Sequence, residues 1–173
     1  FAATYPQRTA GLGIIFSSNN SPLLPPPAPK ALLALIKGPH PSSPREVIVE
    51  NSVRVSKIIG SPAYQKSDAQ LRADAAETYD RCFYPQGFGR HFSAILGSGS
   101  LKRYDARITA PTVVIHGRAD KLMRPAGGRA IAGAIPAARL VVFDGMGHDL
   151  PEPLWDDIVS ELSTTFAHYA EAL

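Results

Sequence analysis

The chain has 173 residues, of which 45% are hydrophobic and 19% are charged, as expected for a globular domain with a real core. Its 18 Lys and Arg exceed its 15 Asp and Glu by only three, and they are scattered rather than gathered in a basic stripe, which argues against nucleic acid as a partner. The single cysteine excludes an internal disulfide but leaves the compartment open, and no apolar stretch approaches the length of a membrane span. Our expectation for the location is the cytoplasm, without a membrane segment.

The amino-terminal region predicts one buried strand followed by a stiff connection. Residues 11–16 are apolar without alternation, which is the pattern of a strand covered on both faces. Residues 17–20 end that strand with two serines and two asparagines. Residues 21–29 contain five prolines and are therefore expected to be extended.

Residues 30–100 predict three or four short helices. The first, over residues 30–37, should stop at the Gly-Pro pair that follows it. The second should begin with a capping box in which Ser43 is the N-cap and Glu46 is its partner, and it should run to residue 59.

Asp68 should cap a third helix whose apolar face includes Cys82, so that Cys82 is expected to be buried. A helical insertion between two parallel strands indicates a lid, which would exclude water from a site and set its specificity. Some of the aromatic residues that follow are expected to face the pocket under this lid, and the candidates are Phe83, Tyr84, Phe88 and Phe92.

Two loops in the last third of the chain each follow a short apolar run. The sequence PTVVIHGRAD, residues 111–120, delivers Asp120, and LVVFDGMGHDLP, residues 140–151, delivers His148. Residues 125–135 between them predict a helix, so the segment is expected to be a parallel βαβ unit with both side chains at the carboxyl edge of the sheet. An Asp and a His in that place can be the orienter and the base of a nucleophilic triad.

The residues around His148 favour it as a general base. Glycines on both sides of Met146 let the backbone turn sharply and present the imidazole without obstruction. Asp120 would accept a hydrogen bond from the other ring nitrogen. Its rivals, Asp144 and Asp149, are closer to the histidine in sequence but are expected to be turn or capping groups.

The remaining groups predict no metal and no cofactor, because neither an H-E-x-x-H motif nor a set of Cys and His ligands is present. His116, at a strand end, is expected to be structural. Residues 153–173 predict an amphipathic helix that packs on the sheet, with its apolar face formed by Trp155, Ile158, Val159, Leu162, Phe166, Tyr169 and Leu173.

These motifs resemble the α/β-hydrolase superfamily, and the serine esterases and methylesterases in particular. The runs ITAPTVVIHGRAD and RLVVFDGMGHDLP are similar to its last two core strands, and an acid that precedes the histidine matches its chain order. The resemblance implies an α/β fold with a parallel sheet, helices on both faces and a helical lid. It also implies core residues 1–18 with a helix end and a strand, a cap over residues 19–105, and core residues 106–173 with two strands and two helices.

The nucleophile that the resemblance requires is missing from the sequence. No G-x-S-x-G occurs, and the run Gly97-Ser98-Gly99-Ser100 has the wrong spacing and indicates a loop at a helix end. Phe1 cannot serve as an amino-terminal nucleophile. We therefore predict a carboxyl-terminal portion of a hydrolase, with the serine on an upstream segment. That amino-terminal half, nicked or separate, would be its partner.

The predicted function is hydrolysis of a small-molecule carboxylic ester through an acyl-enzyme, with His148 as base and Asp120 as orienter. Two alternatives remain open. One is a haloalkane dehalogenase or epoxide hydrolase of the same fold, whose nucleophile is an aspartate, and the other is a non-catalytic ligand-binding member. Association of two copies into a homodimer is also left open.

Overall fold

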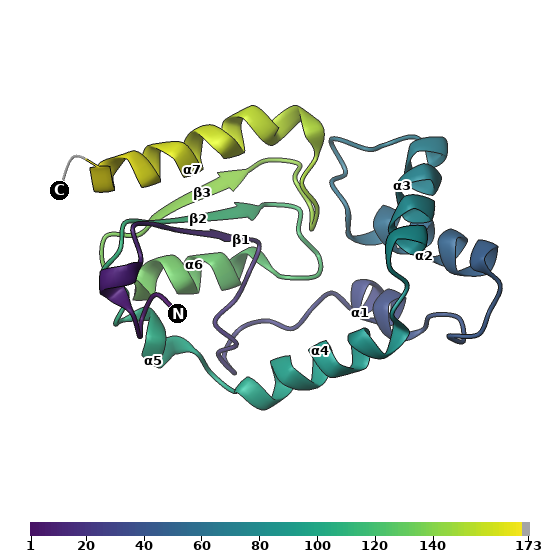
Figure 1. The fold of residues 1–173 in the computed structure, drawn as a ribbon, viewed down its shortest axis with the longest axis horizontal. Coiled ribbons are helices and arrows are strands. Elements are labelled where there is room, and N and C mark those ends of the chain that lie inside the picture. The colour runs from purple at the N-terminus through teal and green to yellow at the C-terminus, as the bar shows by residue number, and fades with distance from the viewer. Residues whose placement is uncertain (171–173) are drawn as a thin grey trace.

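A computed structural model describes the backbone of residues 1–170 and the side chains of residues 1–167. At its centre is a sheet of three parallel strands in the order β1 (Leu12–Ile15), β2 (Thr112–Gly117) and β3 (Arg139–Phe143). Helix α6 (Pro125–Ala134) covers one face and α7 (Trp155–Ala170) covers the other (Figure 1). The predicted α/β fold with helices on both faces of a parallel sheet is confirmed.

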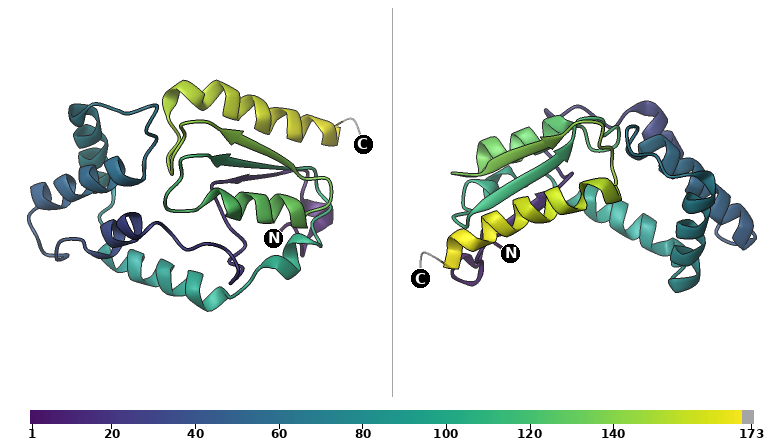
Figure 2. Two further views of the ribbon diagram at one scale, coloured as in Figure 1. Left: turned by 180° about the vertical axis from the view of Figure 1, so that it is seen from behind. Right: turned by 90° about the horizontal axis from the view of Figure 1, so that it is seen from above.

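The other helices connect β1 to β2. They are α1 (Pro29–Ile36), α2 (Arg45–Ile59), α3 (Asp68–Arg81), α4 (Pro85–Ser98) and α5 (Lys102–Asp105). Outside this connection, two short 3-10 helices span Pro6–Arg8 before β1 and Glu152–Leu154 after β3. Helices α1 to α3 lie beyond the carboxyl ends of the strands, and α4 leads back toward α5 and the sheet, as two further views also show (Figure 2). None of the helices in the described part of the chain is long and apolar enough to cross a membrane.

The central strand β2 explains the unbroken apolar runs in the sequence, because all six of its residues are buried. Successive side chains of a strand point to opposite faces of the sheet. Val114 accordingly packs with Ile131 of α6, whereas Val113 and Ile115 pack with Ile158 of α7. Both faces of this strand are therefore covered, which explains why its apolar residues do not alternate with polar ones.

The capping box predicted at Ser43 is wrong. Pro44 occupies the N-cap position of α2, with φ −52° and ψ 148°, so Ser43 lies one residue too early and no side chain caps the helix. The capping box lies at α3 instead, where Ser67 and Gln70 each bond to the backbone of the other. Asp68 is the first residue of that helix and not its cap.

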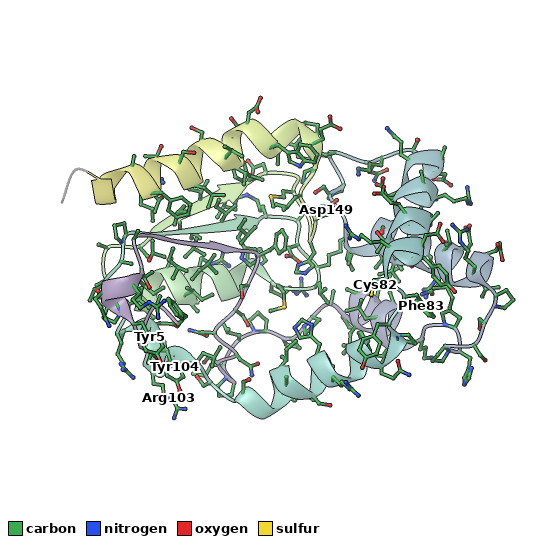
Figure 3. The ribbon with its side chains drawn as sticks, in the orientation of Figure 1. Tyr5, Cys82, Phe83, Arg103, Tyr104 and Asp149 are labelled. Atoms are coloured by element: carbon green, nitrogen blue, oxygen red, sulfur yellow. The ribbon has the colours of Figure 1, made fainter. Side chains whose placement is uncertain are left out.

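The predicted burial of Cys82 is also wrong, because this residue is exposed. It follows the last residue of α3 in an extended conformation, with φ −167° and ψ 98°, so its side chain leaves the helical face on which the spacing placed it. Cys82 and Phe83 lie together where the chain leaves the helix (Figure 3).

The ends of the chain differ from the prediction in detail. In place of a regular helix end, residues 1–5 form one turn closed by two 2.9 Å hydrogen bonds to the Phe1 carbonyl, and the 3-10 helix at Pro6–Arg8 follows. The last helix starts at Trp155 rather than at residue 153. The predicted apolar contributions of Tyr169 and Leu173 lie outside the described side chains.

Gly117 ends β2 directly beneath the loop that carries His148. A Cβ at this position would overlap the carbonyl oxygens of Met146 and Gly147. Since both obstacles are backbone atoms, the loop itself must move, and we expect Gly117→Ala to lower the free energy of unfolding by about 1–3 kcal/mol. Gly133→Ala is the matched control, because it faces open space on α6 and should gain up to about 1 kcal/mol from helix propensity. Denaturant unfolding measures both, and equal stability of the two variants would contradict the packing described.

Candidate active site

Asp120 and His148 meet at the carboxyl edge of the sheet. Asp120 lies in the loop after β2 and His148 lies in the loop after β3. The Nδ1 of His148 is 2.8 Å from Oδ2 of Asp120, which is a hydrogen bond between residues 28 positions apart. The two strands are paired in parallel from Val113 to Gly117, so their following loops emerge side by side.

The Asp120 carboxylate is buried and fully engaged, with 2% of the residue exposed. Its second oxygen, Oδ1, accepts hydrogen bonds from the backbone N–H groups of Leu122 and Met123, each at 2.8 Å. Its own N–H donates to the carbonyl of Gly117 at 3.2 Å. A buried carboxylate needs such partners, and these leave Oδ2 directed to the histidine ring.

His116 is a structural residue in the centre of the sheet. It is fully buried on the α6 face of β2, where its ring lies against Gly128. Its Nε2 donates to the carbonyl of Met123 at 2.7 Å, and its Nδ1 makes no hydrogen bond in the described part of the chain. The ring thus ties the loop that holds Asp120 to the strand before it.

The two rival carboxylates are engaged elsewhere. Asp144 is exposed and forms an ion pair with Arg118 across the ends of β2 and β3. Asp149 accepts a hydrogen bond from the hydroxyl of Ser61, which lies between α2 and α3. Among the described residues, the carboxylate that bonds to the His148 ring is that of Asp120.

The glycines around Met146 have a reason that the sequence did not reveal. Gly145 has a φ of +72°, and a Cβ there would overlap the side chain of Ala63. A Cβ at Gly147 would overlap the backbone of Gly60. The histidine loop therefore turns as predicted, but it also lies against the connection between α2 and α3.

His148 lines a cavity of about 690 Å³ between the sheet edge and the helices. Its walls are mainly apolar and come from the end of β1, the proline-rich connection, α1 and α4, together with the loop between β2 and α6 and Gly127 of α6. The helix residues among them include Leu32, Leu35, Phe88, Phe92 and Ile95. Pockets of this size and character bind small organic molecules.

Two of the four aromatic candidates line this cavity, namely Phe88 and Phe92. Phe83 does not line it and instead stacks on Tyr79, with ring centroids 4.5 Å apart. Tyr84 lies outside the lining as well. Helical spacing identified the segment, but it did not determine which side of it faces the pocket.

Phe16 contacts the candidate base and was missed in the sequence. Its ring centroid lies 4.7 Å from that of His148, and its φ is +34°, a value that costs a bulky residue backbone strain.

The chain beyond Phe16 is fixed by Asn19, whose Nδ2 donates to Oδ2 of Asp105 at 2.8 Å. Burial raises the pKa of the Asp105 carboxyl, and the hydrogen bond from Asn19 opposes that rise.

No described serine hydroxyl hydrogen-bonds to the His148 ring. Ser17 and Ser18 line the same cavity, and the Ser18 hydroxyl accepts a hydrogen bond from the N–H of Asn20. Ser98 ends α4 and donates to the carbonyl of Ala94 at 2.7 Å. The geometry therefore places a hydrogen-bonded pair, His148 and Asp120, where His148 lines an apolar cavity.

The known proteins to which this chain is similar in sequence and structure include several hydrolases. No protein-family model matches the chain. A 2-hydroxy-6-oxononadienedioate/2-hydroxy-6-oxononatrienedioate hydrolase of Cupriavidus pinatubonensis is 28% identical over 151 residues, which cover 86% of this chain and 50% of that protein. The chain thus spans about half the length of this curated relative.

Solved structures share the architecture. A meta-cleavage product hydrolase from Pseudomonas fluorescens superposes with a TM-score of 0.64 at 19% identity, over 99% of this chain and 60% of its own. A 2-hydroxy-6-oxo-6-phenylhexa-2,4-dienoate hydrolase from Rhodococcus gives 0.69 at 17% identity, over 96% and 58%. An esterase from Rhodococcus gives 0.64 at 16% identity, over 91% and 56%. At such identities the likeness establishes a fold, and this chain has part of the α/β-hydrolase fold.

Proposed function

We propose that this chain is the carboxyl-terminal part of a hydrolase that cleaves carboxylic esters through an acyl-enzyme. The observation that carries the proposal is the 2.8 Å hydrogen bond from His148, which lines an apolar cavity, to the buried Asp120. Asp120 is the orienter, because its remaining oxygen is fixed by two backbone N–H groups. His148 is the base.

In this mechanism Nε2 of His148 takes the proton of a serine hydroxyl as that oxygen attacks the ester carbonyl. The tetrahedral intermediate collapses, and the same nitrogen gives the proton to the departing alcohol oxygen. Water then attacks the acyl-enzyme while Nε2 of His148 takes its proton, and the same nitrogen returns the proton to the serine oxygen as the acid is released. Asp120 keeps the Nδ1 proton in place throughout and stabilises the imidazolium.

We place the nucleophile and the oxyanion N–H groups on a segment upstream of residue 1. The described sequence has no G-x-S-x-G, and the chain spans 50–60% of the hydrolases that it matches. Strand β1 is at the edge of the sheet order β1-β2-β3, so one side of it is free to pair with a further strand. A parallel strand there would end at the same edge of the sheet as the loop of His148, and in this proposal it carries the elbow serine.

Residues 19–105 act in this proposal as the lid, which decides which ester fits. Most of the cavity wall comes from this segment, including Phe88 and Phe92 of α4. The wall is mainly apolar, which favours esters with apolar acyl or alcohol groups.

A second candidate is the reaction named for the relative from Cupriavidus, hydrolysis of a 2-hydroxy-6-oxononadienedioate. It is favoured by the sequence similarity, and the same His148 and Asp120 would serve it. Among the described lining residues Arg124 carries the one guanidinium, and this mainly apolar wall fits a dianion less well than an uncharged ester. Parallel assays with p-nitrophenyl esters and with that dienedioate decide between the two.

Loss of either member of the pair should be visible in the kinetics of the complete protein. We expect His148→Ala to reduce kcat to a small residual activity. Asp120→Asn should reduce kcat by about 10⁴-fold, because the imidazole would no longer be held in the required tautomer and orientation. Asp144→Asn is the control, because that exposed carboxylate pairs with Arg118 instead. If Asp120→Asn keeps more than about a tenth of the wild-type kcat while Asp144→Asn loses most of it, the assignment of Asp120 as the acid is wrong.

The cavity wall should set chain-length preference. Phe92→Ala enlarges the cavity and is expected to raise kcat/KM for long-chain p-nitrophenyl esters relative to the acetate, since acyl groups gain room. Phe83→Ala removes the same side chain outside the cavity and should leave that ratio unchanged. If both variants change kcat/KM for all esters by the same factor, the helices do not select the substrate.

The 173-residue chain produced alone should be inactive and prone to aggregate. The free edge of β1 exposes unpaired backbone groups between apolar faces, which favours intermolecular strand pairing. Co-expression with the upstream segment is expected to restore a monodisperse product and ester cleavage. Size-exclusion chromatography and an esterase assay measure both. A monodisperse, active monomer of the chain alone would contradict the proposal and would direct attention to Ser17, Ser18, Ser98 and Ser100.

A further inference from the structure

The connection between α2 and α3 lies directly against the loop that carries His148. The N–H of His148 donates to the carbonyl of Ile59 at 2.8 Å, and the N–H of Ala63 donates to the carbonyl of Gly145 at 3.3 Å. These bonds join a segment of residues 59–64 to one of residues 144–149, more than 80 positions away in sequence. Figure 3 shows Asp149 at this junction, on the side of the sheet edge that faces α2 and α3.

The hydroxyl of Ser61 is the centre of this junction. It accepts a hydrogen bond from the N–H of Gly147 at 2.9 Å and donates one to Oδ1 of Asp149. Ser61 is only 3% exposed, so one buried hydroxyl uses both its donor and its acceptor capacity. Its two partners are the residues immediately before and after His148.

Close backbone contact fixes the register of this junction. A Cβ at Gly147 would overlap the carbonyl of Gly60, and a Cβ at Gly60 would approach both the carbonyl of Ser56 and the carboxylate of Asp149. Neither loop can slide past the other without breaking the bonds to Ser61. The imidazole is therefore held from two directions, by Asp120 at the ring and by Ser61 at the backbone.

We propose that Ser61 and Asp149 are positioning residues for the base, so that the helical segment fixes His148 in addition to forming the cavity wall. This inference rests on the proposed role of His148. It assigns to residues 59–64 a role in the chemical step, and a residue that orients the base should affect kcat more than KM.

The test uses Ser61→Ala and Asp149→Ala in the complete protein, with two readouts. The first is amide hydrogen exchange of residues 144–149, which does not depend on activity. Loss of the Ser61 hydroxyl should accelerate exchange at Gly147 and His148 about tenfold, the factor that corresponds to one net hydrogen bond, while exchange elsewhere in α2 and α3 stays unchanged. The second is ester hydrolysis, in which we expect kcat to fall about tenfold and KM to change by less than about twofold.

Two further variants make the result specific. Asp149→Asn keeps an oxygen that accepts from Ser61 and should recover most of the kcat that Asp149→Ala loses. Ser52→Ala removes a hydroxyl whose one hydrogen bond within the described residues is to the carbonyl of Ile48, 3.0 Å away in the same helix, and it should leave both readouts at the wild-type value.

Several results would overturn the proposal. They are unchanged exchange at Gly147 and His148 in both alanine variants, faster exchange with unchanged kcat, or a rise of KM that accounts for the whole loss of kcat/KM. Uniformly faster exchange across the protein would make Ser61 a general stability residue, and it would also contradict the proposal. A complete wild-type protein without hydrolase activity would end the proposed function, whereas the exchange result would still decide whether Ser61 holds the histidine loop.

Discussion

The parallel pairing of β2 with β3 is the constraint on which the candidate site depends. It brings the loops after the two strands to one edge of the sheet, and it places the carboxylate of Asp120 2.8 Å from the ring of His148. The pairing requires a crossover helix between the strands, and α6 provides it while it covers one face of the sheet. The site is thus a consequence of topology, because residues that are distant in sequence share an edge once the strands are parallel.

Burial makes the hydrogen bonds of Asp120 necessary for the stability of the fold. An isolated carboxylate inside a protein costs several kcal/mol, so Asp120 is tolerated only because backbone N–H groups and a histidine engage both of its oxygens. The same loop is tied to the strand by His116, and Gly117 lets the histidine loop pass close above it. Removing one of the hydrogen bonds to Asp120 would leave a buried polar group with one partner fewer, which is costly in a protein interior.

Much of this arrangement could be predicted from the sequence. Apolar runs that end in a Gly-rich turn identified the strands, and the order of Asp120 and His148 identified the fold, because those signals are local. The failures were also local in origin. At Ser43 the next residue is a proline that takes the cap position, and at Cys82 the chain has already left the helix. The contacts of Phe16 with His148 and of Ser61 with Gly147 and Asp149 join residues that are far apart in sequence, and no spacing rule reports such contacts.

The most direct test of the account is covalent labelling of the complete protein with a fluorophosphonate, which transfers its phosphorus to a serine oxygen activated by a histidine and releases fluoride. Peptide mapping by mass spectrometry then locates the adduct. The account predicts a single labelled serine on a segment upstream of residue 1, and it predicts that labelling is lost in His148→Ala. Labelling that persists without His148, an adduct on Ser17 or Ser18, or no adduct in a correctly folded protein would contradict it.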